Sequence, residues 1–193
     1  IVVDPLLLRI TSLGFALLFL IAAAHKFSNR EHFRASFEAY EIIPVLLSAL
    51  VAKIIPPLEL LLGIGWLAFG LFAIEFKLVA LISAGLLASY ALAIGVNLKR
   101  GRNYINCGCS FSNSSAPNTD SGSQQISLGL FCRNVLLVVM AIVCAIPASD
   151  RSLQLVDFFG MLFSVIALIL LYGTFNQILM TRNTISSWRK SNA

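Results

Sequence analysis

The strongest constraint on the fold of this chain is a series of apolar runs that are long enough to cross a lipid bilayer. These runs cover residues 5–24, 56–74, 77–98, 127–146 and 154–175. Lipid offers the backbone no hydrogen bonds, so a spanning segment is either a helix of about 20 residues or a strand of a closed barrel. Unbroken apolar runs lack the alternation that a barrel strand needs. The sequence therefore predicts an all-α membrane protein, a single domain over residues 1–193 with about five transmembrane helices.

Composition agrees with a lipid environment. The chain is 58% hydrophobic and 12% charged, whereas a soluble domain carries about 25% charged residues. The net charge of +5 would suggest nucleic acid as a partner of a soluble protein. Here the basic residues lie beside the apolar runs, which indicates orientation in a membrane, with lipid as the partner and no nucleic acid.

One apolar stretch is too short to be a span of its own. Residues 42–55 are apolar, but a helix of this length reaches only about 21 Å. Pro56 and Pro57 follow directly and remove two backbone donors, which interrupts a helix. We therefore expect 44–55 to be an interfacial or re-entrant helix that leads into the second span.

The lysines and arginines of the loops and tail predict an orientation. Two fall on one side of a five-span chain, Lys77 and Arg151. The other side receives Lys26, Arg30, Arg34, Lys99, Arg100, Arg102, Arg182, Arg189 and Lys190. Cytoplasmic loops carry the excess of positive charge, so this side is predicted to be cytoplasmic. A sixth span at 42–55 would abolish the bias, which favours five.

The long polar loop at 99–126 carries two cysteines, Cys107 and Cys109, on either side of Gly108. A disulfide between them would close a very small, strained ring, and strained disulfides are readily reduced. The basic residues at the start of the loop favour the thiolate form. This pattern favours thiol–disulfide exchange. Inert loop cysteines and half of a metal site are the alternatives, and the loop lacks a histidine for a metal.

Two further cysteines lie near the fourth span. Cys132 falls in its opening turns, where it could resolve a mixed disulfide if the loop folds back, although cysteines at such places are often packing residues. Cys144 lies twelve residues later, about 18 Å deeper. It is not expected to join the same chemistry.

Charged residues inside the predicted spans need partners, because an isolated charge at the centre of a bilayer costs about 2.5–3.5 kcal/mol. Arg9 and Glu59 are the two such residues, but a five-span drawing places them at different depths. Glu59 could instead pair with His25 or Lys26 at the end of the first span. Anchoring of both residues at the membrane interfaces is a further alternative.

A second polar pair, Arg133 and Asn134, enters the fourth span next to Cys132. Arg133 could hold an acidic group or a quinone oxygen beside the cysteine loop.

Four segments carry a resemblance to a known family. They read "AAAHKFSNREHFRASFEAYEIIP", "PPLELLLGIGWLAFG", "NCGCSF" and "ISLGLFCRNVLLV". Together they resemble the MauE proteins of methylamine utilisation, which are similar to the broader DoxX group of small membrane proteins. The resemblance implies a four-helix DoxX-like core with one additional helix in the bacterial cytoplasmic membrane.

The resemblance also implies a role in maturing methylamine dehydrogenase, whose small subunit is rich in disulfides. Cys107 and Cys109 would exchange disulfides with a thioredoxin-like partner. His25, Lys26, Glu59, Arg133 and Asn134 match polar positions of the family whose role is unassigned. No metal is expected, and a quinone is the one cofactor under consideration. Whether the chain is itself an oxidoreductase or an accessory to one stays open.

The chain departs from the family pattern at its cysteine motif. Asn106 replaces the usual Asp, Ser110 and Phe111 replace Phe-Gly, and a serine-rich insertion follows. These departures leave open a paralogue recruited to another complex, as a non-catalytic subunit or as a quinone- or lipid-binding subunit. The family role also belongs on the oxidising outer face, while the charge count places the loop inside.

Overall fold

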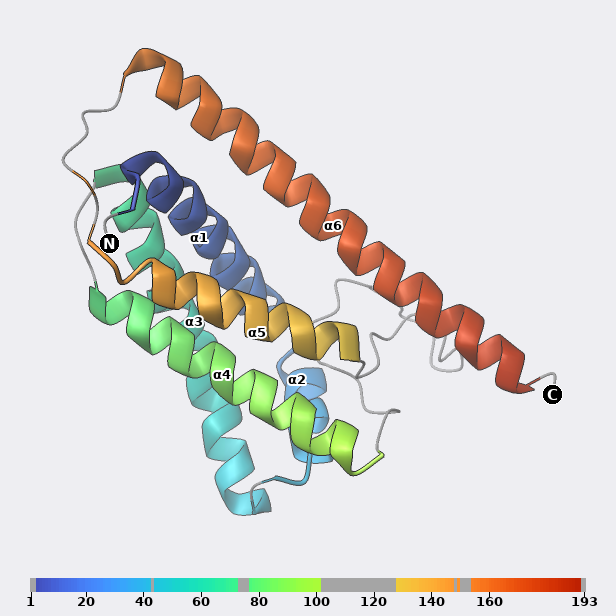
Figure 1. The fold of residues 1–193 in the computed structure, drawn as a ribbon. Helices are drawn as coiled ribbons and strands as arrows, with labels where there is room; N and C mark the ends of the chain where they lie inside the picture. The colour runs from blue at the N-terminus through green and yellow to red at the C-terminus, as the bar shows by residue number, and fades with distance from the viewer. Residues whose placement is uncertain are drawn as a thin grey trace.

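Helices make up almost all of the part of the chain that the structure describes. The structure is a computed structural model that describes residues 3–42, 44–72, 77–101, 128–147, 149 and 154–191. Its helices are α1 (Pro5–Ser28), α2 (Arg30–Ala39), α3 (Val45–Phe72), α4 (Lys77–Lys99), α5 (Leu128–Val143) and α6 (Leu155–Ser191) (Figure 1). The predicted all-α membrane fold is confirmed.

The start of α1 is set by two residues that favour a helix N-terminus. The side chain of Asp4 accepts a hydrogen bond of 2.8 Å from the amide of Leu6, and Pro5 occupies the first turn. Both features are favoured at helix starts, because the first amides have no partner inside the helix. Buried residues then recur every three or four positions: Leu8, Ser12, Phe15, Ala16, Phe19, Ala23 and Lys26. This stripe faces the bundle, and its last member is charged.

The predicted interruption at Pro56 and Pro57 is wrong. Both prolines lie inside α3, which runs without a break for 28 residues, so 44–55 is the first part of this helix and no separate element. The prolines lack the amides that would bond the carbonyls of Ala52 and Lys53, a loss of about 3 kcal/mol per proline in an isolated helix. Tertiary packing compensates, because Ala52 and Ile55 are buried against Phe33 of α2.

Helices α1 and α3 run antiparallel and approach closely at two glycines. A Cβ atom built on Gly63 would lie 2.8 Å from Leu20 Cγ, and one built on Gly70 would lie 2.8 Å from Ser12 Oγ. Helix association in lipid depends on packing, which small residues permit by letting backbones come close. Gly63 and Gly70 are therefore the contact points that fix the register of this helix pair.

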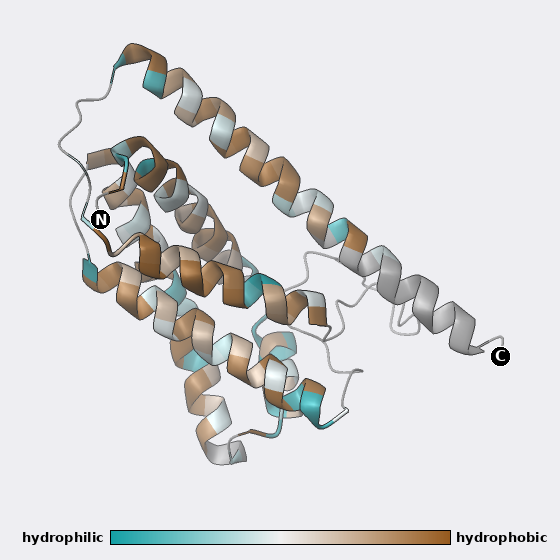
Figure 2. Cartoon of the chain, viewed as in Figure 1, coloured by the Kyte–Doolittle hydropathy of each residue, from teal (hydrophilic) through white to brown (hydrophobic). Residues whose placement is uncertain are grey.

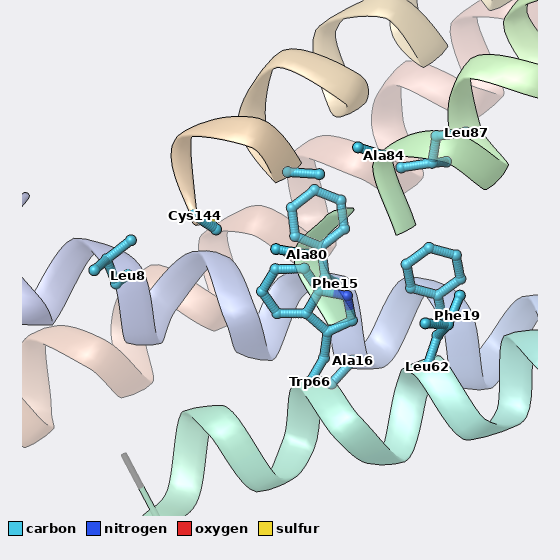
Figure 3. Packing of buried hydrophobic residues seen from close by; sticks show 11 residues of the cluster. Leu8, Phe15, Ala16, Phe19, Leu62, Trp66, Ala80, Ala84, Leu87 and Cys144 are labelled. Carbon is cyan, nitrogen blue, oxygen red and sulfur yellow. The ribbon is translucent and has the colours of Figure 1, made fainter. Parts of the chain in front are cut away.

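The core is shared by four helices and is rich in aromatic rings (Figure 3). Phe15 of α1 stacks on Trp66 of α3, with 4.9 Å between ring centroids. The indole nitrogen of Trp66 donates a hydrogen bond of 2.9 Å to Ser83 of α4. Ala141 of α5 is fully buried in the same cluster. These four helices therefore share one hydrophobic cluster.

The outer surface of the bundle is apolar as well (Figure 2). By length and composition, α1, α3, α4 and the first part of α6 can each cross a membrane, whereas α5, with 16 residues, is apolar but shorter. Helix α6 lies along the outside of the bundle (Figure 1), and none of its apolar window is buried. Such a surface is stable only in contact with lipid or other apolar helices.

The antiparallel arrangement sorts the chain into two ends. One end holds the start of α1 and the end of α5, where the amide of Val3 donates to the carbonyl of Pro147. The other end holds α2, the start of α3, the end of α4 and the start of α5 (Figure 1). We call this second end the loop end, because residues 102–127 are attached there on both sides.

Candidate functional site

A buried ionic cluster joins three helices inside the bundle. Lys26 of α1 forms an ion pair and hydrogen bond with Oε1 of Glu59 in α3. Tyr90 of α4 donates a hydrogen bond of 2.7 Å to the same oxygen, and its own oxygen lies 3.2 Å from Lys26 Nζ. The three polar groups therefore form a hydrogen-bonded triangle, and Glu59 Oε1 is the acceptor for both of the other two.

The cluster is isolated from solvent. Lys26 is 2% exposed and Glu59 is 1% exposed. The ammonium group also lies 5.0 Å from the ring centroids of both Phe33 and Tyr90, a cation–π geometry that offsets part of the lost hydration. A buried ion pair is costly unless further hydrogen bonds satisfy its atoms. Tyr90 and the two rings supply that support.

One oxygen of the cluster lacks a hydrogen-bond donor. Oε2 of Glu59 is buried and has no partner among the described residues. Leaving a buried polar group unsatisfied costs about 1–3 kcal/mol, and more for a charged group. Among the described residues, no group of three or more metal-ligating side chains surrounds this oxygen. Oε2 can accept a hydrogen bond from a small donor.

Lys26 and Glu59 come together because each continues a buried stripe of its helix. Lys26 follows Ala23 at the end of the α1 stripe. On α3, Glu59 lies between the buried residues Ile55 and Leu62. Because α1 and α3 are antiparallel, the register set at Gly63 and Leu20 brings the two charges to the same level.

The structure decides between the pairings predicted for Glu59. Its partner is Lys26, which was one of the alternatives. Arg9 is half-buried near the start of α1, 17 residues before Lys26 and about 26 Å away along the helix. Arg9 and Glu59 thus lie at different depths in the bundle, as the five-span drawing predicted. His25 precedes Lys26 and is half-buried.

Arg133 and Asn134 have separate surroundings. Arg133 lies 3.4 Å from the hydroxyl of Tyr172 and 5.6 Å from its ring, which ties α5 to α6. Asn134 is buried and donates a hydrogen bond of 2.9 Å to the carbonyl of Leu130 in its own helix. Their predicted role in binding a cofactor stays a prediction.

The described cysteines differ in environment. Cys132 is exposed, whereas Cys144 is buried, with 3.2 Å between its sulfur and the hydroxyl of Thr11. Cys144 lies at the end of the bundle opposite the loop end, as its distance along α5 predicted. Cys107 and Cys109 lie outside the described residues, so the predicted exchange between them stays a prediction.

Sequence reasoning missed Tyr90 and Phe33. Tyr90 interrupts a span of aliphatic residues, and it lies seven residues from Ser83 on one side and seven from Asn97 on the other. This heptad spacing places three polar side chains on one face of α4. The spacing is a signal that could have identified Tyr90, whereas nothing in the sequence of α2 distinguishes Phe33 from Phe37.

The fold and the cluster define the class of protein. Long apolar helices around a shared core, with a charged cluster sealed inside it, make this a multi-pass helical membrane protein. A family model described as "Methylamine utilisation protein MauE" matches residues 4–147. The chain belongs to the MauE family, as the resemblance predicted, and α6 lies beyond the matched region.

Curated relatives support the same assignment. The chain is 31% identical over 153 residues to the methylamine utilization protein MauE of Paracoccus denitrificans, covering 76% of each chain. Its identity to the MauE protein of Methylophilus methylotrophus is 36% over 106 residues, covering 55% of this chain and 54% of that protein. Its identity to the MauE protein of Paracoccus versutus is 32% over 136 residues, covering 69% of this chain and 67% of that protein. No solved structure matches the chain significantly.

Proposed function

We propose that this protein supports methylamine utilisation by assisting the maturation of a methylamine dehydrogenase from the bacterial cytoplasmic membrane. Membership of the MauE family carries this proposal. The step assigned to the chain is thiol–disulfide exchange through Cys107 and Cys109. A thioredoxin-like protein is the proposed partner in that exchange.

The geometry of the loop end supports this step. Gly101 and Leu128 attach residues 102–127 to neighbouring helices at one end of the bundle. Cys107 follows Gly101 by six residues, a tether of at most about 20 Å. Cys132 is exposed at the same end, about 6 Å along α5 from Leu128. A tether of this length allows Cys107 to reach Cys132.

The proposed exchange conserves atoms and electrons. A client thiolate attacks the disulfide between Cys107 and Cys109 and forms a mixed disulfide. A second client thiolate displaces it, which leaves the client oxidised and both cysteines reduced. Two electrons and two protons pass to the chain. The disulfide of an oxidised thioredoxin-like partner then accepts them, which re-forms the Cys107–Cys109 disulfide and leaves the partner as a dithiol.

The test uses the natural host with its own copy of the gene replaced by serine variants. Cys107→Ser, Cys109→Ser and the double variant should abolish growth on methylamine and leave free thiols in the small subunit of the dehydrogenase. Alkylation followed by gel electrophoresis measures those thiols. Cys144→Ser is the matched control, because a serine there keeps the contact with Thr11. Full growth of the double variant would refute the exchange step.

A second function is favoured by the surface of α6. None of the apolar window of this helix is buried, and its described contacts with the bundle include Arg133 beside Tyr172 and Leu168 beside Gly14. A long exposed apolar helix suits packing against a larger membrane complex. In this case the chain is a non-catalytic subunit, and the double serine variant assembles and functions normally.

A further inference from the structure

We propose that Lys53 binds the phosphate group of an anionic phospholipid at the membrane surface of the loop end. This inference goes beyond disulfide exchange and depends on none of the cysteines. It rests on the depth of Lys53 along α3, on the apolar residues around it and on the basic side chains that α2 presents at the same end of the bundle.

The thickness of a bilayer places Lys53 at the edge of the hydrocarbon layer. A hydrocarbon core of about 30 Å corresponds to about 20 residues of helix. Counted back from Phe72, where α3 ends, this length reaches the level of Lys53. Counted from Lys77, where α4 begins, it reaches the last turn of that helix, beside Lys99. Both Lys53 and Lys99 therefore lie at the loop end close to the layer of lipid phosphate groups (Figure 1).

Lys53 lies on a face of α3 that contacts lipid. Its side chain is exposed, and its neighbours on the helix surface, Leu50 and Ile54, are exposed as well. A lysine in such apolar surroundings extends its flexible chain along the helix so that the ammonium group reaches the polar interface. The charge of Lys53 is thus directed to the phosphate layer.

The described part of the chain provides no anion for Lys53. Its ion pairs join Lys26 to Glu59 and Arg34 to Glu38, and Lys53 belongs to neither. An anionic lipid from the surrounding membrane can supply the counterion without any rearrangement of the bundle, because Lys53 is already exposed on its surface.

Helix α2 presents further basic side chains at the same end of the bundle. Its Phe33 packs in one cluster with Ala52, the residue before Lys53. Arg30 and Arg34 flank Phe33 in the sequence of α2, and both are exposed. Amphipathic helices with basic residues on the polar face bind at the membrane interface, and clustered lysines and arginines beside a membrane attract anionic lipids. The loop end therefore favours an anionic lipid over a zwitterionic one.

A phospholipid fits both the charged and the apolar part of this surface. The ammonium group of Lys53 can donate hydrogen bonds to the phosphate oxygens. The acyl chains can lie along the exposed apolar residues of α3 that follow, which include Ile54, Leu61 and Ile64. A free phosphate ion would make only the first of these contacts, and this difference separates a lipid site from a site for a soluble anion.

The test is native mass spectrometry of the full chain in detergent, titrated with dioleoylphosphatidylglycerol or with dioleoylphosphatidylcholine. Lys53→Gln should weaken binding of the first phosphatidylglycerol molecule about fivefold, which corresponds to about 1 kcal/mol for one basic residue at a lipid surface. Lys53→Arg should retain the affinity, and neither variant should change the weaker binding of phosphatidylcholine. Equal affinities of Lys53→Gln and the unchanged chain for phosphatidylglycerol would overturn the proposal.

Two controls separate this site from general attraction between charges. Lys77→Gln removes an exposed lysine at the opposite end of the bundle and should leave binding of the first phosphatidylglycerol molecule unchanged. A fivefold loss in this variant as well would overturn the proposal, because affinity would then follow net charge. Inorganic phosphate in excess, at matched ionic strength, should not displace the lipid, and displacement would identify a soluble anion as the ligand instead. Growth on methylamine plays no part in this test, so its outcome is independent of the proposed function.

Discussion

At the scale of single residues, Lys26 and Glu59 each depend on the other to remain charged inside the bundle. Both are almost completely buried, and each would lose its main stabilising contact if the other were removed. Breaking a buried pair is therefore more harmful than replacing both members by apolar residues, because the single change leaves one uncompensated charge.

Lys26→Met or Glu59→Leu should each lower the free energy of unfolding by about 3–5 kcal/mol. The double variant should lose much less than the sum of the two, since it leaves no buried charge. Unfolding by denaturant in mild detergent measures all three. Simple additivity in the double variant would show that the two charges do not interact.

The exposed ion pair of α2 provides a control for these variants. Arg34 Nε lies 2.8 Å from Glu38 Oε1, and Arg34 is 58% exposed. Surface pairs of this type contribute about 0.3–0.5 kcal/mol. Arg34→Met should therefore change stability by no more than this amount in the same assay.

At the scale of helices, the close contact of α1 with α3 determines which side chains meet. Gly63 lies against Leu20, and Gly70 lies against Ser12 and Leu13. These two contacts fix how far one helix is displaced along the other. The same register brings Lys26 to Glu59, so the polar cluster depends on two glycines that have no chemical role of their own.

Gly63→Ala and Gly70→Ala should each destabilise the protein by about 1–3 kcal/mol, because the added methyl group overfills the contact. Gly85→Ala is the matched control, since a Cβ atom there meets nothing within 4 Å. Alanine favours a helix more than glycine by about 1 kcal/mol, so this control should be neutral or stabilising. Thermal unfolding in detergent, followed by helical circular dichroism, compares the three. Equal effects at all three glycines would contradict the role assigned to the α1–α3 contact.

At the scale of the whole molecule, the bundle has two ends whose exposed charges differ. The loop end displays Arg30, Arg34, Lys53, Lys99 and Arg100 as exposed basic residues. At the opposite end, Lys77 is the exposed basic residue of the described segments. This is the distribution that orients membrane proteins with the basic end in the cytoplasm.

Cysteine labelling measures the orientation directly. In a chain whose native cysteines are replaced by serine, Lys77→Cys should react with a membrane-impermeant maleimide in intact cells. Lys99→Cys, about 33 Å away along α4, should react only after the cells are opened. The reverse pattern would place the loop end on the oxidising side, where the family role of disulfide exchange is more readily performed.

Much of the fold could be predicted from local sequence. The limits of α1 and α4 agree with the apolar runs at 5–24 and 77–98 within a few residues. The break predicted at Pro56 failed, because packing of the neighbouring residues against α2 outweighs the lost hydrogen bonds. Helix α6 extends to Ser191, well past its predicted end. Hydropathy shows only which part of a helix is apolar enough to lie in lipid, and a helix can continue beyond that part.

The sequence by itself determined that the chain belongs in a membrane, where most of its long apolar helices lie and which charges need partners, because lipid penalises each exposed polar group residue by residue. Tertiary structure alone decided that Glu59 pairs with Lys26 and not with Arg9, and that Tyr90 completes the cluster. Those choices depend on the register of antiparallel helices, which is set by packing at Gly63 and Gly70. Such contacts join residues far apart in the chain, and no local pattern encodes them.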